Sequence, residues 1–147
     1  IWSNMADWIC CIITLCNFPT LPLAKGGMGD LKFGGYMDPI HLFEKVEFSK
    51  ENFVPKQLHI GDAGAAVLIC FEPGQAMPLH PHPGAVEVIL YGVEGEGTLA
   101  IGDEEKPFKK GDLIFCKGET PIGPKNTGQG RFVVLVILVL KKLVSQG

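Results

Sequence analysis

The sequence has little charge and no hydrophobic run long enough to cross a membrane. Charged residues make up 20% of the 147 residues, and 13 basic against 16 acidic side chains leave a net charge of −3. The basic residues are scattered, so no patch attracts nucleic acid. The most apolar runs, Ile9–Leu15 and Phe132–Leu140, are far shorter than the roughly 20 residues of a membrane-spanning helix. We therefore expect neither a nucleic-acid partner nor a membrane span.

Paired cysteines and the common catalytic motifs are also missing. The five cysteines are odd in number and show no Cys-x-x-Cys spacing, which predicts a reducing, cytoplasmic location. Neither a nucleophile elbow nor a Walker motif occurs, and no helix is expected behind the glycines of 92–97 to make a phosphate loop. The sequence therefore assigns no catalytic residue.

Long helices are absent after residue 50, where no apolar stripe of helical period extends over ten residues. Turn signals such as Gly61-Asp62 and Gly102-Asp103 instead separate short apolar stretches. We expect strands at Ile40–Phe48, Gln57–Ile60, Ala65–Phe71, Met77–His82, Val86–Val93, Thr98–Ile101, Glu105–Phe108, Leu113–Cys116 and Arg131–Leu140. This spacing predicts an all-β, jelly-roll type of barrel in a single domain. A short helical turn after Asp38-Pro39 is a weaker possibility.

The first 36 residues differ in composition from the rest. Residues 1–24 hold both tryptophans and three of the cysteines, and residues 25–35 are a glycine-rich stretch typical of a linker. We expect residues 1–36 to be an extension and linker outside the barrel, and residues 37–147 to form the barrel domain. Two origins stay open for residues 1–27: a native extension, or translated sequence upstream of a start at Met28 or Met37.

Two histidines and a glutamate lie close together in a proline-rich stretch. His80 and His82 are two residues apart, so on an extended strand both rings point to the same face, and Glu87 follows five residues later. Two imidazoles and a carboxylate suit a divalent metal such as Fe, Mn, Ni, Cu or Zn. A stiff surface loop that happens to contain two histidines is the simpler alternative.

This stretch resembles the first motif of the cupin family: glycine, five residues, His-x-His, three or four residues, glutamate, six residues, glycine. Gly74, the two histidines and Glu87 fit the motif, and the closing Gly95 arrives one residue late. We expect a β-bulge, at about Gly92, to absorb that extra residue. The resemblance covers about residues 37–140 and implies a double-stranded β-helix fold.

The second cupin motif is degenerate. Gly111 and Asn126 fit, but Ile122 stands where the family has its third histidine ligand, and no histidine follows residue 82. Cys116, Gln75, Cys70 and Met77 are candidate substitute ligands by residue type. Cys116 is the best of these, since it ends the strand that leads into the second motif, although a buried cysteine is more often a small core residue. Pocket-lining positions are expected at Gln75, Met77, Tyr91, Cys116 and Ile122.

The resemblance implies small-molecule binding in the barrel, with a divalent metal on His80, His82 and Glu87. Two alternatives stay open: a mononuclear metal-dependent oxygenase or sugar isomerase or epimerase, and a metal-free ligand-binding or sensing module. Phe132–Leu140 is apolar on both alternating faces, and Ile40–Phe48 offers a possible edge strand, so we expect a homodimer. The rival expectation is that the second sheet or residues 1–24 cover the outer face of Phe132–Leu140.

Overall fold

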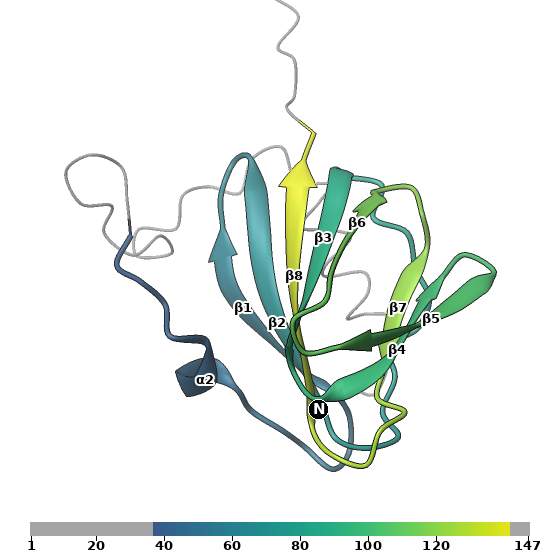
Figure 1. Cartoon of the computed structure of the whole chain (residues 1–147). Helices are drawn as coiled ribbons and strands as arrows, with labels where there is room; N and C mark the ends of the chain where they lie inside the picture. The colour runs from purple at the N-terminus through teal and green to yellow at the C-terminus, as the bar shows by residue number, and fades with distance from the viewer. Residues whose placement is uncertain (1–36, 142–147) are drawn as a thin grey trace, which may run out of the picture.

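Eight short strands form two facing antiparallel sheets in the computed structural model, which describes residues 37–141 (Figure 1). The five-stranded sheet has the order β1-β2-β8-β3-β6, and the three-stranded sheet has the order β5-β4-β7. The strands are β1 (Val54–Ile60), β2 (Gly64–Phe71), β3 (Ala85–Glu94), β4 (Glu96–Ile101), β5 (Glu104–Lys109), β6 (Leu113–Lys117), β7 (Ile122–Lys125) and β8 (Phe132–Leu140). The expected all-β class is confirmed. The extension 1–36, with Cys10, Cys11 and Cys16, lies outside the described residues.

Three segments differ from the expected strands. The expected strand Ile40–Phe48 is wrong, because its centre is the one-turn helix α2 (Leu42–Lys45). The segment 77–82 makes one isolated bridge, from His80 to Ile122, rather than a strand, because its two prolines cannot donate to a ladder. Strand β7 was not predicted, because Gly123 and Pro124 at its centre are turn-type residues.

Alternate residues of the five-stranded sheet point inward and form the main core with the small sheet. On β8 the inward side chains are Phe132, Val134, Val136 and Leu138, which are all buried. Residues of β2 to β7, together with Met77, complete this cluster. The space between the two sheets is therefore filled mainly by apolar side chains.

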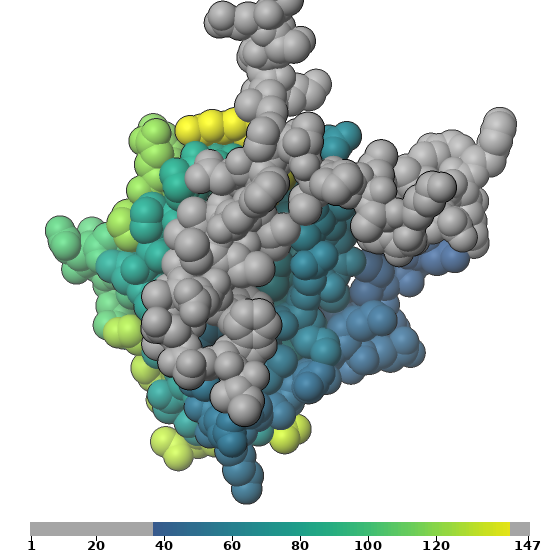
Figure 2. Space-filling view, turned by 180° about the vertical axis from the view of Figure 1, so that it is seen from behind, coloured from purple at the N-terminus to yellow at the C-terminus, as the bar shows by residue number. Residues whose placement is uncertain are grey.

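The other face of the same sheet carries a second, smaller cluster. Leu68, Cys70 and Val133 point outward and pack against side chains of residues 42–48. In Figure 2 this segment, in blue, lies beside the teal β1–β2 hairpin. Within the described residues, the cover over this part of β8 is thus the segment that includes α2 and not the second sheet.

The bulge expected near Gly92 is confirmed. The β3–β8 register shifts between Gly92 and Glu94, and Val93 turns outward into the second cluster. Gly95 follows with φ +76°, and a Cβ there would lie 2.0 Å from the carbonyl oxygen of Arg131. Only glycine fits this tight junction between β3 and β4.

In residues 37–141, no helix is long and apolar enough to cross a membrane.

Candidate functional site

The histidine stretch lies alongside β7 and extends the small sheet at its edge. Met77 donates its backbone N–H to the carbonyl of Pro124 at 2.9 Å. His80 and Ile122 exchange backbone hydrogen bonds of 3.2 Å and 3.0 Å. These bonds hold an otherwise irregular, proline-rich segment in an extended form. The side chain of His80 is thereby fixed next to that of Ile122.

A close backbone contact fixes the second histidine. His82 donates its N–H to the carbonyl of Gly118 at 2.7 Å. A Cβ on Gly118 would lie 1.9 Å from the carbonyl oxygen of Ala85 and 2.7 Å from that of His82. The loop after β6 therefore needs glycine here so that its backbone can approach the histidine segment.

Both imidazoles reach a cavity between the two sheets. Their ring centroids are 4.5 Å apart, and both residues are 5% exposed. The cavity has a volume of about 20 Å³, which is enough for one or two water molecules. Its walls are Val67, Ile69, Met77, His80, His82, Leu90, Ile122, Pro124, Val136 and Leu138. Among the described residues, the two histidines are therefore the only polar side chains that line this apolar cavity.

Each histidine leaves one buried ring nitrogen without a hydrogen-bond partner. His80 Nδ1 lies 2.7 Å from the carbonyl oxygen of Pro78, and since a carbonyl only accepts, Nδ1 carries the proton and donates. Nε2 of the neutral ring then keeps a free lone pair, and this atom has no partner. His82 Nδ1 is likewise buried and unpartnered. Such atoms cost free energy in a folded protein unless they serve a ligand.

The environment keeps His82 neutral. Burial in the apolar cavity, and to a lesser extent the charge of the neighbouring His80, together lower its pKa to about 4. Near neutral pH the ring is therefore uncharged, which is the form that binds metals.

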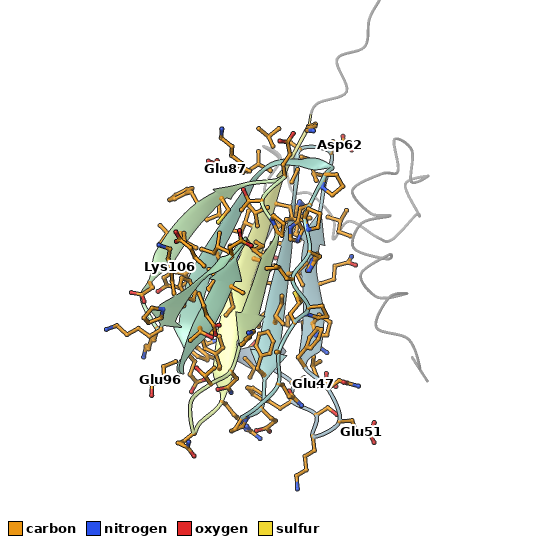
Figure 3. The ribbon with its side chains drawn as sticks, turned by 90° about the vertical axis from the view of Figure 1, so that its right-hand side faces the viewer. Glu47, Glu51, Asp62, Glu87, Glu96 and Lys106 are labelled. Atoms are coloured by element: carbon orange, nitrogen blue, oxygen red, sulfur yellow. The ribbon has the colours of Figure 1, made fainter. Side chains whose placement is uncertain are left out.

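Glu87 does not join the histidines. It is exposed on β3, and Figure 3 shows it at the rim of the sandwich, away from the space between the sheets. The inward positions of β3 are Val88 and Leu90, which stand opposite Leu138 and Val136 of β8. An irregularity between Ala85 and Glu87 sets this register, so the carboxylate misses the inner face by one residue. In the described part of the chain, no three His, Cys, Asp or Glu side chains form a possible metal site.

The structure separates the other expected pocket residues into two groups. Met77 and Ile122 line the cavity. Gln75 instead bonds to the backbone of Ser49 and Glu72. Tyr91 is on the outer face, 39% exposed. Cys116 is in the core but not in the cavity wall, and burial raises the pKa of its thiol, which keeps it protonated.

Sequence reasoning missed six lining residues, which come from strands β2, β3, β7 and β8. They are Val67, Ile69, Leu90, Pro124, Val136 and Leu138. The alternation along β2 and β8 was a usable signal for four of them, since every second residue shares a face.

The buried lone pairs allow a test of whether a metal fits. Two neutral imidazoles, one with its tautomer set by a carbonyl, are a usual pair of metal ligands. No carboxylate lines the cavity among the described residues, so the protein supplies no negative charge there. The residues therefore fit a metal whose remaining ligands come from elsewhere than Asp or Glu.

Comparisons with known proteins agree with this architecture. The family model described as "Cupin domain" matches residues 67–138. An oxalate-binding protein of Thermotoga maritima is 32% identical over 68 residues, which are 46% of this chain and 55% of that protein. The matched part thus spans little more than half the length of that relative.

Two solved structures show the same fold. An RmlC-like cupin protein of Desulfovibrio desulfuricans is 27% identical with a TM-score of 0.61, and the match covers 69% of this chain and 96% of that one. A conserved double-stranded β-helix protein of Klebsiella pneumoniae is 20% identical with a TM-score of 0.67, covering 71% and 91%. The expected double-stranded β-helix is therefore confirmed.

Proposed function

Because the chain belongs to the cupin family through residues 67–138, we propose that it binds a small molecule in the cavity between its sheets, at a metal ion held by His80 and His82. The observation that carries this proposal is the pair of buried, unpartnered ring nitrogens facing one cavity. A divalent ion of the Fe, Mn, Ni, Cu or Zn type accepts two neutral imidazoles.

A small acid is the first ligand class to consider. The relative from Thermotoga maritima is called an oxalate-binding protein. The cavity walls carry no charge, so an isolated dication or dianion would pay a large desolvation cost there. A metal and a two-fold negative acid neutralise each other, so we expect the two to bind together more tightly than either alone.

The chain's own residues would orient the ligand and exclude water. A bound metal supplies a Lewis-acidic centre that accepts oxygen atoms of the ligand. The Pro78 carbonyl fixes the ring of His80, and Ile122 and Leu90 form apolar walls beside it. The cavity has room for little more than the ion itself, so part of a ligand as large as oxalate extends toward the mouth or displaces wall side chains.

Calorimetric titration of oxalate tests this function. Oxalate is added to the protein with one equivalent of Mn²⁺ or Zn²⁺, and again with EDTA. We expect saturable binding only with metal, and its loss in His80→Ala and His82→Ala. His41→Ala, which removes an exposed histidine before α2, is the matched control and should bind as the parent does. Absence of binding under every condition would contradict the proposal.

A metal-free binding or sensing module is the second candidate. It is favoured by Ile122 and Val88, which occupy inward positions beside or near the histidines with apolar side chains. Binding of the same strength with and without EDTA in the titration above would establish this alternative instead.

We further propose that the protein is a homodimer through the outer face of β3 and β6. Tyr91, Leu113 and Phe115 are exposed there, and β6 is the last strand of its sheet within the described residues. Glu87 and Lys117 are in register beside this apolar patch and give it charges of both signs. Such a patch is able to pair with a second copy of itself about a two-fold axis. This surface differs from the one that the sequence predicts, because Leu42–Lys45 is helical and residues 42–48 cover Val133 on the outer face of Phe132–Leu140.

A further inference from the structure

One more side chain in the cavity wall carries an atom that binds metals. Besides the two histidines, the part of the wall that residues 37–141 provide consists of valine, isoleucine, leucine and proline side chains, with the single exception of Met77. Met77 is 6% exposed, and its backbone is bonded to Pro124 on the strand whose Ile122 pairs with His80. Met77 and the two histidines therefore line one small cavity.

We infer that this site selects copper(I), held by His80, His82 and the thioether of Met77. The inference rests on the proposed metal site and names its ion. Thioether sulfur is a soft ligand that favours copper(I), whereas Mn²⁺, Mg²⁺ and Ca²⁺ prefer oxygen. Imidazole accepts copper as well, so all three donors suit this one ion.

The charge of the enclosure points to the same ion. The desolvation cost of an ion grows with the square of its charge, so a dication costs about four times as much as a monocation of equal size. No carboxylate lines the cavity among residues 37–141, and the three donors are neutral. A monovalent ion is therefore favoured unless an anion enters with a divalent one.

The size of the cavity agrees with a low coordination number. A volume of about 20 Å³ accommodates one ion but not the several waters that Mn²⁺ or Mg²⁺ retains. Copper(I) is satisfied by two or three ligands, all of which this wall provides. The side chain of Ile122 then acts as a dry wall that keeps water from the ion.

Residue-specific NMR on the full chain separates this site from the cysteines, which also bind copper(I). Histidine ring ¹⁵N and methionine methyl ¹³C signals are followed during anaerobic addition of copper(I) in the presence of ascorbate. At one equivalent we expect the signals of His80, His82 and Met77 to shift together, while those of His41 and Met37 stay in place.

Matched variants then measure the contribution of the thioether. Met77→Leu keeps the volume of the side chain, and we expect it to weaken copper(I) binding by about tenfold or more while Zn²⁺ affinity stays within about twofold. Met37→Leu, outside the cavity, should leave both affinities unchanged.

The possible failures are distinguishable. If the histidines respond to copper(I) and Met77 does not, the role of the thioether is refuted and the metal site stands. If the histidines respond to Zn²⁺ or Mn²⁺ but not to copper(I), the inference fails and the proposed function is kept. If no ion shifts any of the three, both fail.

Discussion

The two faces of the five-stranded sheet are built from the same strands but serve different purposes. Inward side chains such as Leu90 and Val136 meet the small sheet and surround two buried imidazoles. Outward side chains meet residues 42–48 over β2 and β8, and over β6 they remain exposed. Alternation along a strand thus decides only which face a residue occupies, while the element lying above that face decides whether it becomes core, site or surface.

The largest expected effect on stability comes from truncating one buried leucine on each face of the five-stranded sheet, which tests the comparison of the two faces directly. Leu90→Ala, on the inner face, and Leu68→Ala, on the covered outer face, should each lower the free energy of unfolding by about 3 kcal/mol, because both side chains are fully buried. Phe115→Ala, 57% exposed in the single chain, should lower the unfolding free energy of the monomer by less than about 1 kcal/mol, measured at protein concentrations too low for the proposed dimer to form. Urea denaturation measures all three. Equal losses at Leu90 and Phe115 would show that the outer face of β6 is buried in solution.

A second effect of similar size is a loss of stability at low pH, and it comes from His82 in the space between the two sheets. The folded-state pKa of His82 lies at about 4, below its unfolded value of 6.5. Between these values the unfolded chain binds a proton that the folded chain does not, so stability falls as pH drops from 6.5 and levels off below about 4. The loss amounts to roughly 3 kcal/mol at most.

Urea denaturation of the metal-free protein in EDTA, repeated from pH 7 to pH 4, follows this loss. His82→Gln should remove most of the slope. A variant that keeps the full slope would assign the effect to other groups.

A smaller effect tests the end of the sandwich opposite the histidines. Asn126 is 2% exposed, and its amide donates to the carbonyls of Phe71 and Gly130 while its oxygen accepts from the N–H of Gly128. We expect Asn126→Ala to lower the free energy of unfolding by about 2 kcal/mol, because it removes the buried bond to the Phe71 carbonyl and the part-buried bonds to Gly128 and Gly130. Metal affinity should be unchanged, and a matching loss of affinity would show that the two ends are coupled.

The smallest effect on stability concerns the exposed face and sharpens the assignment of the interface. Phe115→Lys should change the unfolding free energy of the monomer by no more than about 0.5 kcal/mol, since the side chain is already in water. It should convert the dimer to a monomer in multi-angle light scattering. Lys106→Ala, on the exposed β5 strand of the other sheet, is the control. A parent protein that is monomeric at high concentration would refute the interface.

The sequence predicted the fold well where periodicity and turn residues agree. Strands β2 to β6 and β8 were found because apolar stretches lie between clear turn signals, and the bulge after Gly92 followed from one surplus residue before Gly95. Helix α2 was expected only as a weaker alternative after Asp38-Pro39, because a single turn has no measurable period. The packing of residues 42–48 on Leu68 and Val133 joins segments that are far apart in the sequence, so no local pattern indicates it.

The candidate site was predictable in part. The spacing of His80 and His82 correctly placed both rings in one cavity, because the prolines keep the segment extended. The position of Glu87 was not predictable from spacing, because an irregularity of one residue at the start of β3 exchanges the two faces. Val88 therefore occupies the inner face that the motif would assign to the carboxylate.

The position of a bound metal in a crystal tests the central claim most directly. Crystals grown with copper(I) or Zn²⁺ are measured at the absorption edge of the metal, so that anomalous scattering locates the ion. We predict one strong peak in the cavity, about 2.0–2.3 Å from His80 Nε2 and His82 Nδ1. A cavity without a peak, while metal binds elsewhere on the protein, would contradict the account.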